Sequence, residues 1–220
     1  MKVLSFDLDD TLWPVGPVIE AAERELFTWL QESHPAAVHG HSIGSLRALR
    51  ERLASDTPAQ AHDMTWLRHE SLARLFAAAG APPTHADDAL EVFLVARNRV
   101  SLYPDARPAL ERLKHHYRLF ALSNGNADLQ RCGLADLFDG HITARGAGVA
   151  KPHPRIFDCL LREAGVAAAE VLHIGDDPHA DVEGAQRAGM QVVWVNRDAK
   201  RWPEQLALPP RTLTTLADLV

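Results

Sequence analysis

The sequence predicts an α/β protein in which a Rossmann-like, doubly wound parallel sheet carries an inserted block of helices. Short apolar strands alternate with helices after Tyr103, which is the pattern of a parallel sheet. A further short strand around residues 3–6 opens the chain, and no strand pattern interrupts residues 18–99. The helices are therefore inserted between the first strand and the others. We expect residues 1–15 and 100–220 to form the sheet core and residues 16–99 to form a helical domain.

Helical periodicity defines the inserted block. Apolar residues recur there at helical spacing, so we expect helices at about 18–32, 45–53, 64–79 and 84–100. Thr84, with Asp87 three residues later, is typical of a capping box and marks the start of the last helix. Trp29 falls on the apolar stripe of the first helix, which favours a place in the core.

The chain after Tyr103 is predicted to alternate between strands and helices. We expect strands at 119–122, 141–144, 171–174 and 191–195, and helices at 105–116, 154–164, 181–188 and 213–219. Pro154 at the start and Gly165 at the end of one helix follow the usual asymmetry of helix termini. A glycine-rich loop at residues 145–148 is expected before Lys151.

The composition is that of a globular chain: of its 220 residues, 46% are hydrophobic and 24% are charged. The formal net charge of −6 gives no basic footprint for nucleic acid. The chain opens without a signal-peptide pattern, and no apolar run reaches the roughly 20 residues that span a bilayer. The two cysteines, Cys132 and Cys159, form no metal-binding or disulfide pattern. We therefore expect a cytoplasmic protein, a monomer or a weak dimer, with no membrane or nucleic-acid partner.

Polar residues gather where the predicted strands end. Asp7, Asp9 and Asp10 follow the first strand directly. Other strands, or the loops after them, lead into Ser123, Asn124, Lys151, Asp176, Asp177 and Asp181. Because the carboxyl ends of parallel strands meet at one edge of a sheet, we expect these residues to line one pocket.

These residue types suit metal-assisted chemistry on an anionic substrate. Carboxylates beside an apolar strand are costly without a compensating cation, and a hard divalent cation prefers oxygen ligands. One of the paired aspartates can attack phosphorus, while the other protonates the leaving alcohol and then activates water. Ser123 and Lys151 can hold the phosphate oxygens. The pattern therefore predicts a phosphoryl-transfer site with Mg²⁺ as its cofactor.

Four ordered motifs make the chain resemble the haloacid dehalogenase-like hydrolase superfamily over essentially its whole length. They are residues 7–11, 123–125, 151–152 and 175–177 together with Asp181. The resemblance implies that Asp7 is the nucleophile and Asp9 the general acid and base. It also implies that Asp7, the Asp9 carbonyl and Asp176 bind Mg²⁺, while Ser123 and Lys151 bind phosphate. The helical block resembles the family's cap domain, which closes over the site and favours small substrates.

A narrower resemblance is to the bacterial phosphatases of this family that act on flavin mononucleotide and on a riboflavin-pathway phosphate. It lies in residues 6–13, 65–68 together with Ser71, 123–127 and 172–177. Trp13, Trp66 and Arg68 would suit a flat polar ring through stacking and hydrogen bonds, and Asn124 would also contact the substrate. The alternative is that the same two tryptophans and the arginine only pack the helical block against the sheet core.

Other functions stay open at this point. A 2-haloacid dehalogenase shares the fold and the first aspartate, but Asp9 favours a phosphatase because a leaving halide needs no proton. A phosphatase of another sugar phosphate or nucleotide, a mutase and a non-catalytic ligand-binding protein are further alternatives. Either Asp177 or Asp181 can support the metal through water, and Asp181 can equally cap a helix. His173 lies within a predicted strand, which favours a satisfied core histidine over a catalyst.

Overall fold

The computed structural model describes residues 1–207 and 209–219. The chain divides into two compact units. Residues 1–14, 101–125 and 132–220 form the first, here called the sheet unit, and residues 15–100 and 126–131 form the second, the helical unit. Residues 126–131 belong to the helical unit although they follow the second strand of the sheet.

The sheet unit contains six parallel strands in the order β3-β2-β1-β4-β5-β6. Their bounds are β1 Val3–Phe6, β2 Arg118–Ser123, β3 Gly140–Thr143, β4 Val171–Gly175, β5 Gln191–Val195 and β6 Arg211–Leu213. Both neighbours of β1 come much later in the chain, so the strand order reverses beside β1. This confirms the predicted doubly wound parallel sheet, and a reversal of this kind is where such folds place their sites.

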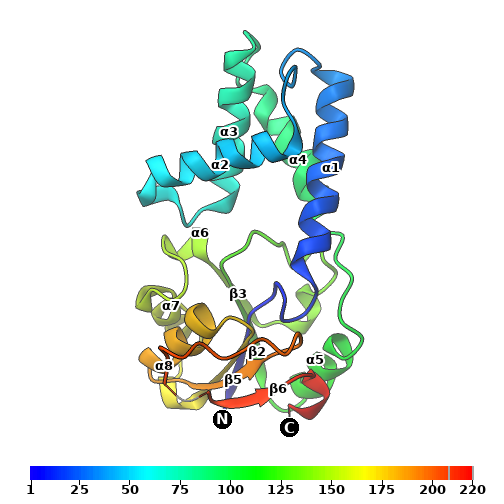
Figure 1. The fold of residues 1–220 in the computed structure, drawn as a ribbon. Helices are drawn as coiled ribbons and strands as arrows, with labels where there is room; N and C mark the ends of the chain where they lie inside the picture. The colour runs from blue at the N-terminus through cyan, green and yellow to red at the C-terminus, as the bar shows by residue number, and fades with distance from the viewer. Residues whose placement is uncertain (208, 220) are drawn as a thin grey trace. The chain divides into compact units, whose positions relative to one another are not determined.

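Helices lie on both sides of the sheet. They are α5 Ala106–Lys114, α6 Ala144–Ala147, α7 Pro154–Ala164 and α8 Gly184–Arg187. In Figure 1, α7 and α8 lie on one side of the strands and α5 on the other. Phe157 of α7 and Phe120 of β2 belong to the same buried apolar cluster. This packing holds the carboxyl ends of the strands in fixed positions relative to one another.

The helical unit contains four helices, labelled in Figure 1. They are α1 Val15–Ser33, α2 Ile43–Asp56, α3 Met64–Ala78 and α4 His85–Arg97. Their apolar faces meet in a cluster that includes Leu26, Phe76 and Phe93, with Trp29 packed against it. The four predicted helices are confirmed, and Trp29 lies at the margin of the core.

The helix starts differ from the prediction at two places. Thr84 makes no side-chain cap, because helical turns already run through it from Pro82 and Pro83, which leaves its backbone helical. The capping box forms instead between Ser42 and Ser45 at the start of α2. The prediction at Thr84 was therefore wrong, since the spacing of two polar residues does not show which of them has an extended backbone.

Three segments of the sheet unit also differ from the prediction. Residues 145–148 are not an open loop, because the Thr143 side chain caps the short helix α6 and Gly148, with φ +72°, ends it. The expected helix 181–188 begins earlier, as a π-helix at Pro178–Glu183 that continues into α8. The expected helix 213–219 is the end of β6 followed by a 3₁₀ turn at Leu216–Asp218. A segment this short has no periodicity to separate strand from helix.

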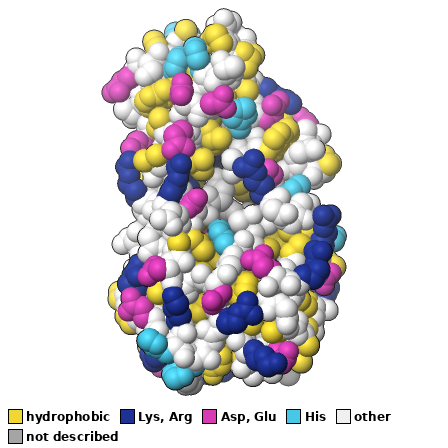
Figure 2. Space-filling view, turned by 180° about the vertical axis from the view of Figure 1, so that it is seen from behind, with side chains coloured by type: hydrophobic (Ala, Val, Ile, Leu, Met, Phe, Trp, Pro, Cys, Tyr) yellow, Lys and Arg dark blue, Asp and Glu magenta, His cyan; other side chains and the backbone are white. Residues whose placement is uncertain are grey.

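No helix in the described part of the chain has the length and apolar character needed to cross a membrane. On the face shown in Figure 2, Lys and Arg side chains alternate with Asp and Glu rather than merging into a basic stripe. This distribution agrees with the acidic net charge of the sequence.

Candidate active site

The carboxyl ends of β1 and β4 bring three carboxylates together. Asp7 directly follows β1, and its backbone N–H donates to the carbonyl of Ile174 in β4 at 2.8 Å. Asp176 directly follows β4, and Asp181 lies in the π-helix beyond it. One oxygen from each carboxylate can be chosen so that all three lie within 4.8 Å of one another. The predicted convergence of the strand-end aspartates is therefore present in the sheet unit.

Lys151 is the cation at the centre of this cluster. Its Nζ donates to Asp7 Oδ1 at 2.6 Å, to Asp181 Oδ1 at 2.6 Å and to the carbonyl of Leu122 at 2.8 Å. An ammonium has three donors, so all of them are used. Burial works against its charge, but the two carboxylates outweigh burial and raise the pKa of Lys151. The lysine is therefore a fixed positive charge.

Asn124 holds the backbone of Lys151. Its Oδ1 accepts from the Lys151 N–H at 2.7 Å, and its Nδ2 donates to the Lys151 carbonyl at 3.0 Å. The neighbouring Ser123 is buried, and its Oγ accepts from the N–H of Gly125 at 2.9 Å. The structure thus shows Asn124 positioning the lysine, and a contact between Asn124 and substrate stays a prediction.

Asp181 is the most thoroughly compensated of the three carboxylates. Besides Lys151, it lies 3.1 Å from Nε2 of His173 and accepts the Asp177 N–H at 3.0 Å. Burial raises its pKa, but the charge of Lys151 and the hydrogen bond from His173 outweigh burial and hold the pKa well below the usual range. A Cβ on Gly175 would overlap the Asp181 carboxylate, so only glycine fits where the strand ends.

His173 is a satisfied core histidine, as the sequence indicated. Burial lowers the pKa of His173, so the ring is neutral near pH 7. The ionised Asp181 assigns the ring proton to Nε2, which leaves Nδ1 to accept from the Ser5 hydroxyl 3.0 Å away. The histidine is fully buried in β4 and acts by fixing Asp181.

The structure separates Asp177 from Asp181, which the sequence left as alternatives. Asp177 is exposed, and its Oδ1 accepts from the backbone N–H groups of His179 and Ala180 at 2.8 and 2.7 Å. Asp177 is therefore the residue that caps the π-helix, and Asp181 is the one that belongs to the carboxylate cluster.

Asp7 and Asp176 are the two carboxylates of the cluster whose pKa values are raised. Burial raises the pKa of Asp7 well above its usual value; Lys151 opposes this shift, while Asp181 and Asp176 add to it. Burial and the charge of Asp181 raise the pKa of Asp176 to about 6. Lys151 bonds two of the three clustered carboxylates, and the ligand atoms that the cluster offers are all oxygens. This donor set and this charge fit a hard divalent cation such as Mg²⁺.

Asp9 is held by Trp13. The indole Nε1 donates to Asp9 Oδ1 at 2.9 Å, within a turn closed by the Asp10 N–H to Trp13 carbonyl bond at 2.7 Å. Asp10 has φ 60°, a conformation that aspartate tolerates better than most residues. Trp13 is completely buried and orients Asp9, and a stacking contact between Trp13 and substrate stays a prediction.

The two residues predicted to bind substrate from the helical block, Trp66 and Arg68, both lie on α3. Arg68 is buried, with its guanidinium carbon 3.4 Å from the ring centroid of Phe93 and Nη2 3.6 Å from Glu23. Burial lowers the pKa of Arg68 to about 9. These contacts stabilise the helical unit, and the expected substrate contacts of both residues stay predictions.

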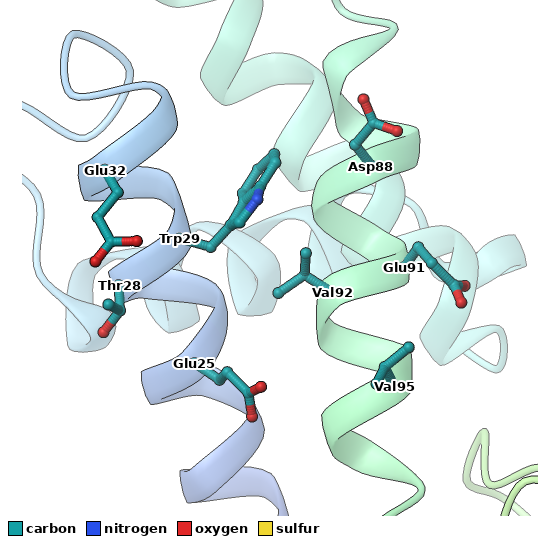
Figure 3. Close-up of a pocket in the computed structure, with 8 residues that line it drawn as sticks. All are labelled: Glu25, Thr28, Trp29, Glu32, Asp88, Glu91, Val92 and Val95. Atoms are coloured by element: carbon teal, nitrogen blue, oxygen red, sulfur yellow. The ribbon is translucent and has the colours of Figure 1, made fainter.

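A separate pocket of about 720 Å³ opens between α1 and α4 (Figure 3). Trp29 lies between the two helices, and the pocket carries carboxylates on both of them. Its lining residues are Glu25, Thr28, Trp29, Glu32, Asp88, Glu91, Val92 and Val95. None of these lining side chains is a cation, so the pocket does not suit a phosphate, and the strand-end cluster stays the candidate active site.

Comparisons with known proteins define the class. A model of the haloacid dehalogenase-like hydrolase family matches residues 1–189, and the chain belongs to this family. The 5-amino-6-(5-phospho-D-ribitylamino)uracil phosphatase YigB of Escherichia coli (strain K12) is 32% identical over 100% of this chain and 94% of its own length. A phosphoserine phosphatase of Thermus thermophilus is 34% identical over 90% of this chain and 89% of its own length.

Among solved structures, one named as a 2-haloacid dehalogenase, from Pseudomonas syringae pv. Tomato DC3000, superposes with a TM-score of 0.93. It is 38% identical and covers 100% of this chain and 96% of its own. The similar proteins thus carry names from both the phosphatase and the dehalogenase branches. The chain is a hydrolase of this family, and its substrate has to be inferred from its own site.

Proposed function

We propose that this hydrolase is a Mg²⁺-dependent phosphatase of small phosphorylated metabolites that acts through an aspartyl-phosphate on Asp7. One observation carries the proposal: a second carboxylate, Asp9, lies two residues after Asp7 and is oriented by Trp13. A leaving alcohol needs a proton, whereas a leaving halide does not. Asp9 therefore has a task in phosphate-ester hydrolysis that it would lack in dehalogenation.

In the first step, a carboxylate oxygen of Asp7 attacks phosphorus while the bond from phosphorus to the alcohol oxygen breaks. Asp9 in its acid form gives its proton to the leaving oxygen. In the second step, Asp9 removes a proton from water, the water oxygen attacks phosphorus, and the bond to Asp7 breaks. Inorganic phosphate leaves, and both carboxyl groups return to their starting forms.

Lys151 serves both steps as a fixed positive charge. Its bond to Asp7 Oδ1 favours the ionised nucleophile, and we expect its charge to stabilise a phosphoryl group that is transferred to this carboxylate. Ser123, at the end of β2, offers a buried hydroxyl to a phosphate oxygen. Asp7, Asp176 and the Asp9 carbonyl would hold Mg²⁺, and the ion would neutralise part of the negative charge of the carboxylates and the phosphate.

We propose a flavin-pathway phosphate as the first substrate to test, either flavin mononucleotide or the phosphorylated ribitylamino-uracil. Two observations support this choice: the residues of the narrower resemblance, and full-length similarity to a phosphatase named for the ribitylamino-uracil phosphate. The 34% identity to a phosphoserine phosphatase makes phosphoserine the necessary competitor. The partner is in each case a small molecule.

The test is phosphate release from a panel containing the flavin-pathway phosphates, phosphoserine, sugar phosphates and nucleotides, with and without Mg²⁺. We expect metal-dependent release with the highest kcat/KM for a flavin-pathway phosphate. Metal-dependent release that favours another member keeps the mechanism and discards the flavin substrate. The absence of release from every member would contradict the phosphatase and leave a non-catalytic binding protein as the better description.

Dehalogenation remains a second candidate, because the structure named as a dehalogenase matches the whole chain at 38% identity. A carboxylate at position 7 could also displace a halide from carbon. Halide release from a 2-haloacid therefore belongs beside the phosphate assay, and we expect none above the rate without protein.

A further inference from the structure

Lys200 places a second ammonium on the carboxylate cluster. It lies in the loop that follows β5, in no motif that the sequence singled out, and its Nζ is 3.2 Å from Asp176 Oδ2. The three donors of Lys151 are already used by Asp7, Asp181 and the Leu122 carbonyl. Lys200 is thus the cation that contacts the third carboxylate.

The loop is built to hold Lys200 in this position. Asn196 Oδ1 accepts from the Lys200 N–H at 2.8 Å, and Asn196 Nδ2 donates to the Lys200 carbonyl at 2.9 Å. One side chain therefore satisfies both backbone groups of the lysine. The preceding Ala199 has φ 52°, in the left-handed region that residues with a Cβ seldom adopt. Such a conformation persists where the surrounding contacts impose it.

The backbone of Asp176 is bound by one member of an aromatic pair. Trp194 of β5 donates from Nε1 to the Asp176 carbonyl at 2.8 Å, and Trp202 packs edge-on against Trp194 with ring centroids 4.9 Å apart. Trp202 lies two residues beyond Lys200, so the loop that carries the lysine also contacts the tryptophan that holds Asp176. Movement of this loop would change the surroundings of Trp202 and, through their ring contact, those of Trp194.

We propose that Lys200 is a positioning residue that acts as the tethered counter-cation of Asp176 and competes with the divalent metal for that carboxylate. The inference rests on the proposed metal site. A divalent ion bound to Asp176 would lie close to the Lys200 ammonium, and the two positive charges would repel each other. Binding of the metal therefore requires Lys200 to withdraw, and the side chain, which is 49% exposed, has solvent into which it can move.

The test is the dissociation constant of Mg²⁺, measured by calorimetry without substrate on the wild type and on Lys200→Met. We expect Lys200→Met to bind Mg²⁺ about tenfold more tightly, because the ion then no longer has to displace an ammonium from Asp176. Asn196→Ala, which frees the loop but keeps the charge, should tighten binding by a smaller factor. Tryptophan fluorescence during the same titration gives a second readout through Trp194 and Trp202.

The matched control is Arg201→Met. It removes one positive charge from the adjacent residue, whose Nη2 pairs with Glu204 at 2.6 Å instead of with the cluster. We expect its affinity for Mg²⁺ to stay within about twofold of the wild type, since an exposed charge that is already paired with Glu204 is screened. Equal tightening in Arg201→Met and Lys200→Met would reduce the effect to net charge and overturn the proposal.

The outcomes separate this inference from the proposed function. If the wild type binds Mg²⁺ and Lys200→Met binds it equally or more weakly, the proposed competition is overturned and the metal site is retained. If the wild type, Lys200→Met and Arg201→Met all fail to bind Mg²⁺, both the proposed metal site and the role of Lys200 are overturned. Binding by the wild type that is lost in Asp176→Asn and tightened in Lys200→Met would support both.

Discussion

The Nζ of Lys151 lies 2.6 Å from Oδ1 of Asp7, although 144 residues separate the two in the sequence. The same ammonium bonds Asp181, so one lysine is shared by two buried carboxylates. Asp181 has His173 and the Asp177 N–H as further partners, whereas Asp7 has the nearby charges of Asp181 and Asp176 against it. Asp7 is thus the buried carboxylate of this pair with the weaker compensation, as suits a nucleophile that works with a bound cation.

Replacing Asp7 with Asn is predicted to abolish turnover while leaving the fold intact. The amide keeps the shape of the side chain but cannot form the acyl phosphate. The fold should tolerate the amide, because burial already raises the pKa of the Asp7 carboxyl and so disfavours its charged form. Phosphate release and circular dichroism on Asp7→Asn measure the two parts. Asp158→Asn, at an exposed position of α7, is the control and should keep the wild-type rate. A wild-type rate in Asp7→Asn would rule out the nucleophile.

Replacing Asp9 with Asn is predicted to lower kcat by about 10²–10⁴, because the leaving oxygen then departs without a proton from the protein. The loss should be smaller for substrates with an acidic leaving group, such as an aryl phosphate, which need less help from a proton. Steady-state rates for an alkyl and an aryl phosphate measure this difference. Equal losses of kcat on both substrates would argue against Asp9 as the proton donor to the leaving oxygen.

Replacing Asp176 with Asn is predicted to stabilise the metal-free protein in a pH-dependent way. Burial and the charge of Asp181 raise the pKa of Asp176 from 3.8 to about 6, so the folded state holds this proton more tightly than the unfolded state. The wild type should therefore lose stability relative to Asp176→Asn as pH rises from about 4 to about 6, by up to about 3 kcal/mol.

Urea unfolding in the presence of a chelator, at several pH values, measures that difference. The gap between Asp176→Asn and the wild type should be smallest near pH 4 and level off above pH 6. A gap that does not change with pH would show that the Asp176 carboxyl has an ordinary pKa in the folded protein. Added Mg²⁺ should narrow the gap above pH 6, since it stabilises only a protein that keeps the carboxylate.

Replacing Gly175 with Ala is predicted to destabilise the sheet unit, because the added methyl group would overlap the buried Asp181 carboxylate. We expect a loss of about 2–4 kcal/mol, together with loss of activity. Gly16→Ala is the matched control, since a Cβ at that position on α1 meets nothing within 4 Å. Chemical unfolding of both variants gives the comparison, and equal stabilities would show that the strand end tolerates a side chain.

The sequence alone was sufficient to predict the parallel sheet and its helical insertion. Short apolar strands such as β2 and β5 stand between clear helical periodicities, and a parallel sheet brings their carboxyl ends to one edge. The carboxylates Asp7 and Asp176 were found in this way, because each directly follows a strand. The substrate contacts expected of Trp66 and Arg68 remain predictions, since the sequence pattern does not show what a side chain on a helix will contact.

The parts that sequence could not predict depend on contacts between distant residues. Nothing in the pattern separates Asp177 from Asp181, because the distinction lies in which carboxylate faces Lys151 and which accepts from the π-helix backbone. The role of Asn124 in holding Lys151 depends on a pairing across 27 residues. Lys200 gave no signal, since a single lysine in a polar loop resembles any surface lysine.

The most direct test of the central claim runs two assays on the same preparation. Phosphate release from the flavin-pathway phosphates and phosphoserine, with and without Mg²⁺, is measured beside halide release from a 2-haloacid. The account predicts Mg²⁺-dependent phosphate release that disappears in Asp7→Asn, with no halide release. Halide release that depends on Asp7, without phosphate release from any ester, would contradict it and make the protein a dehalogenase.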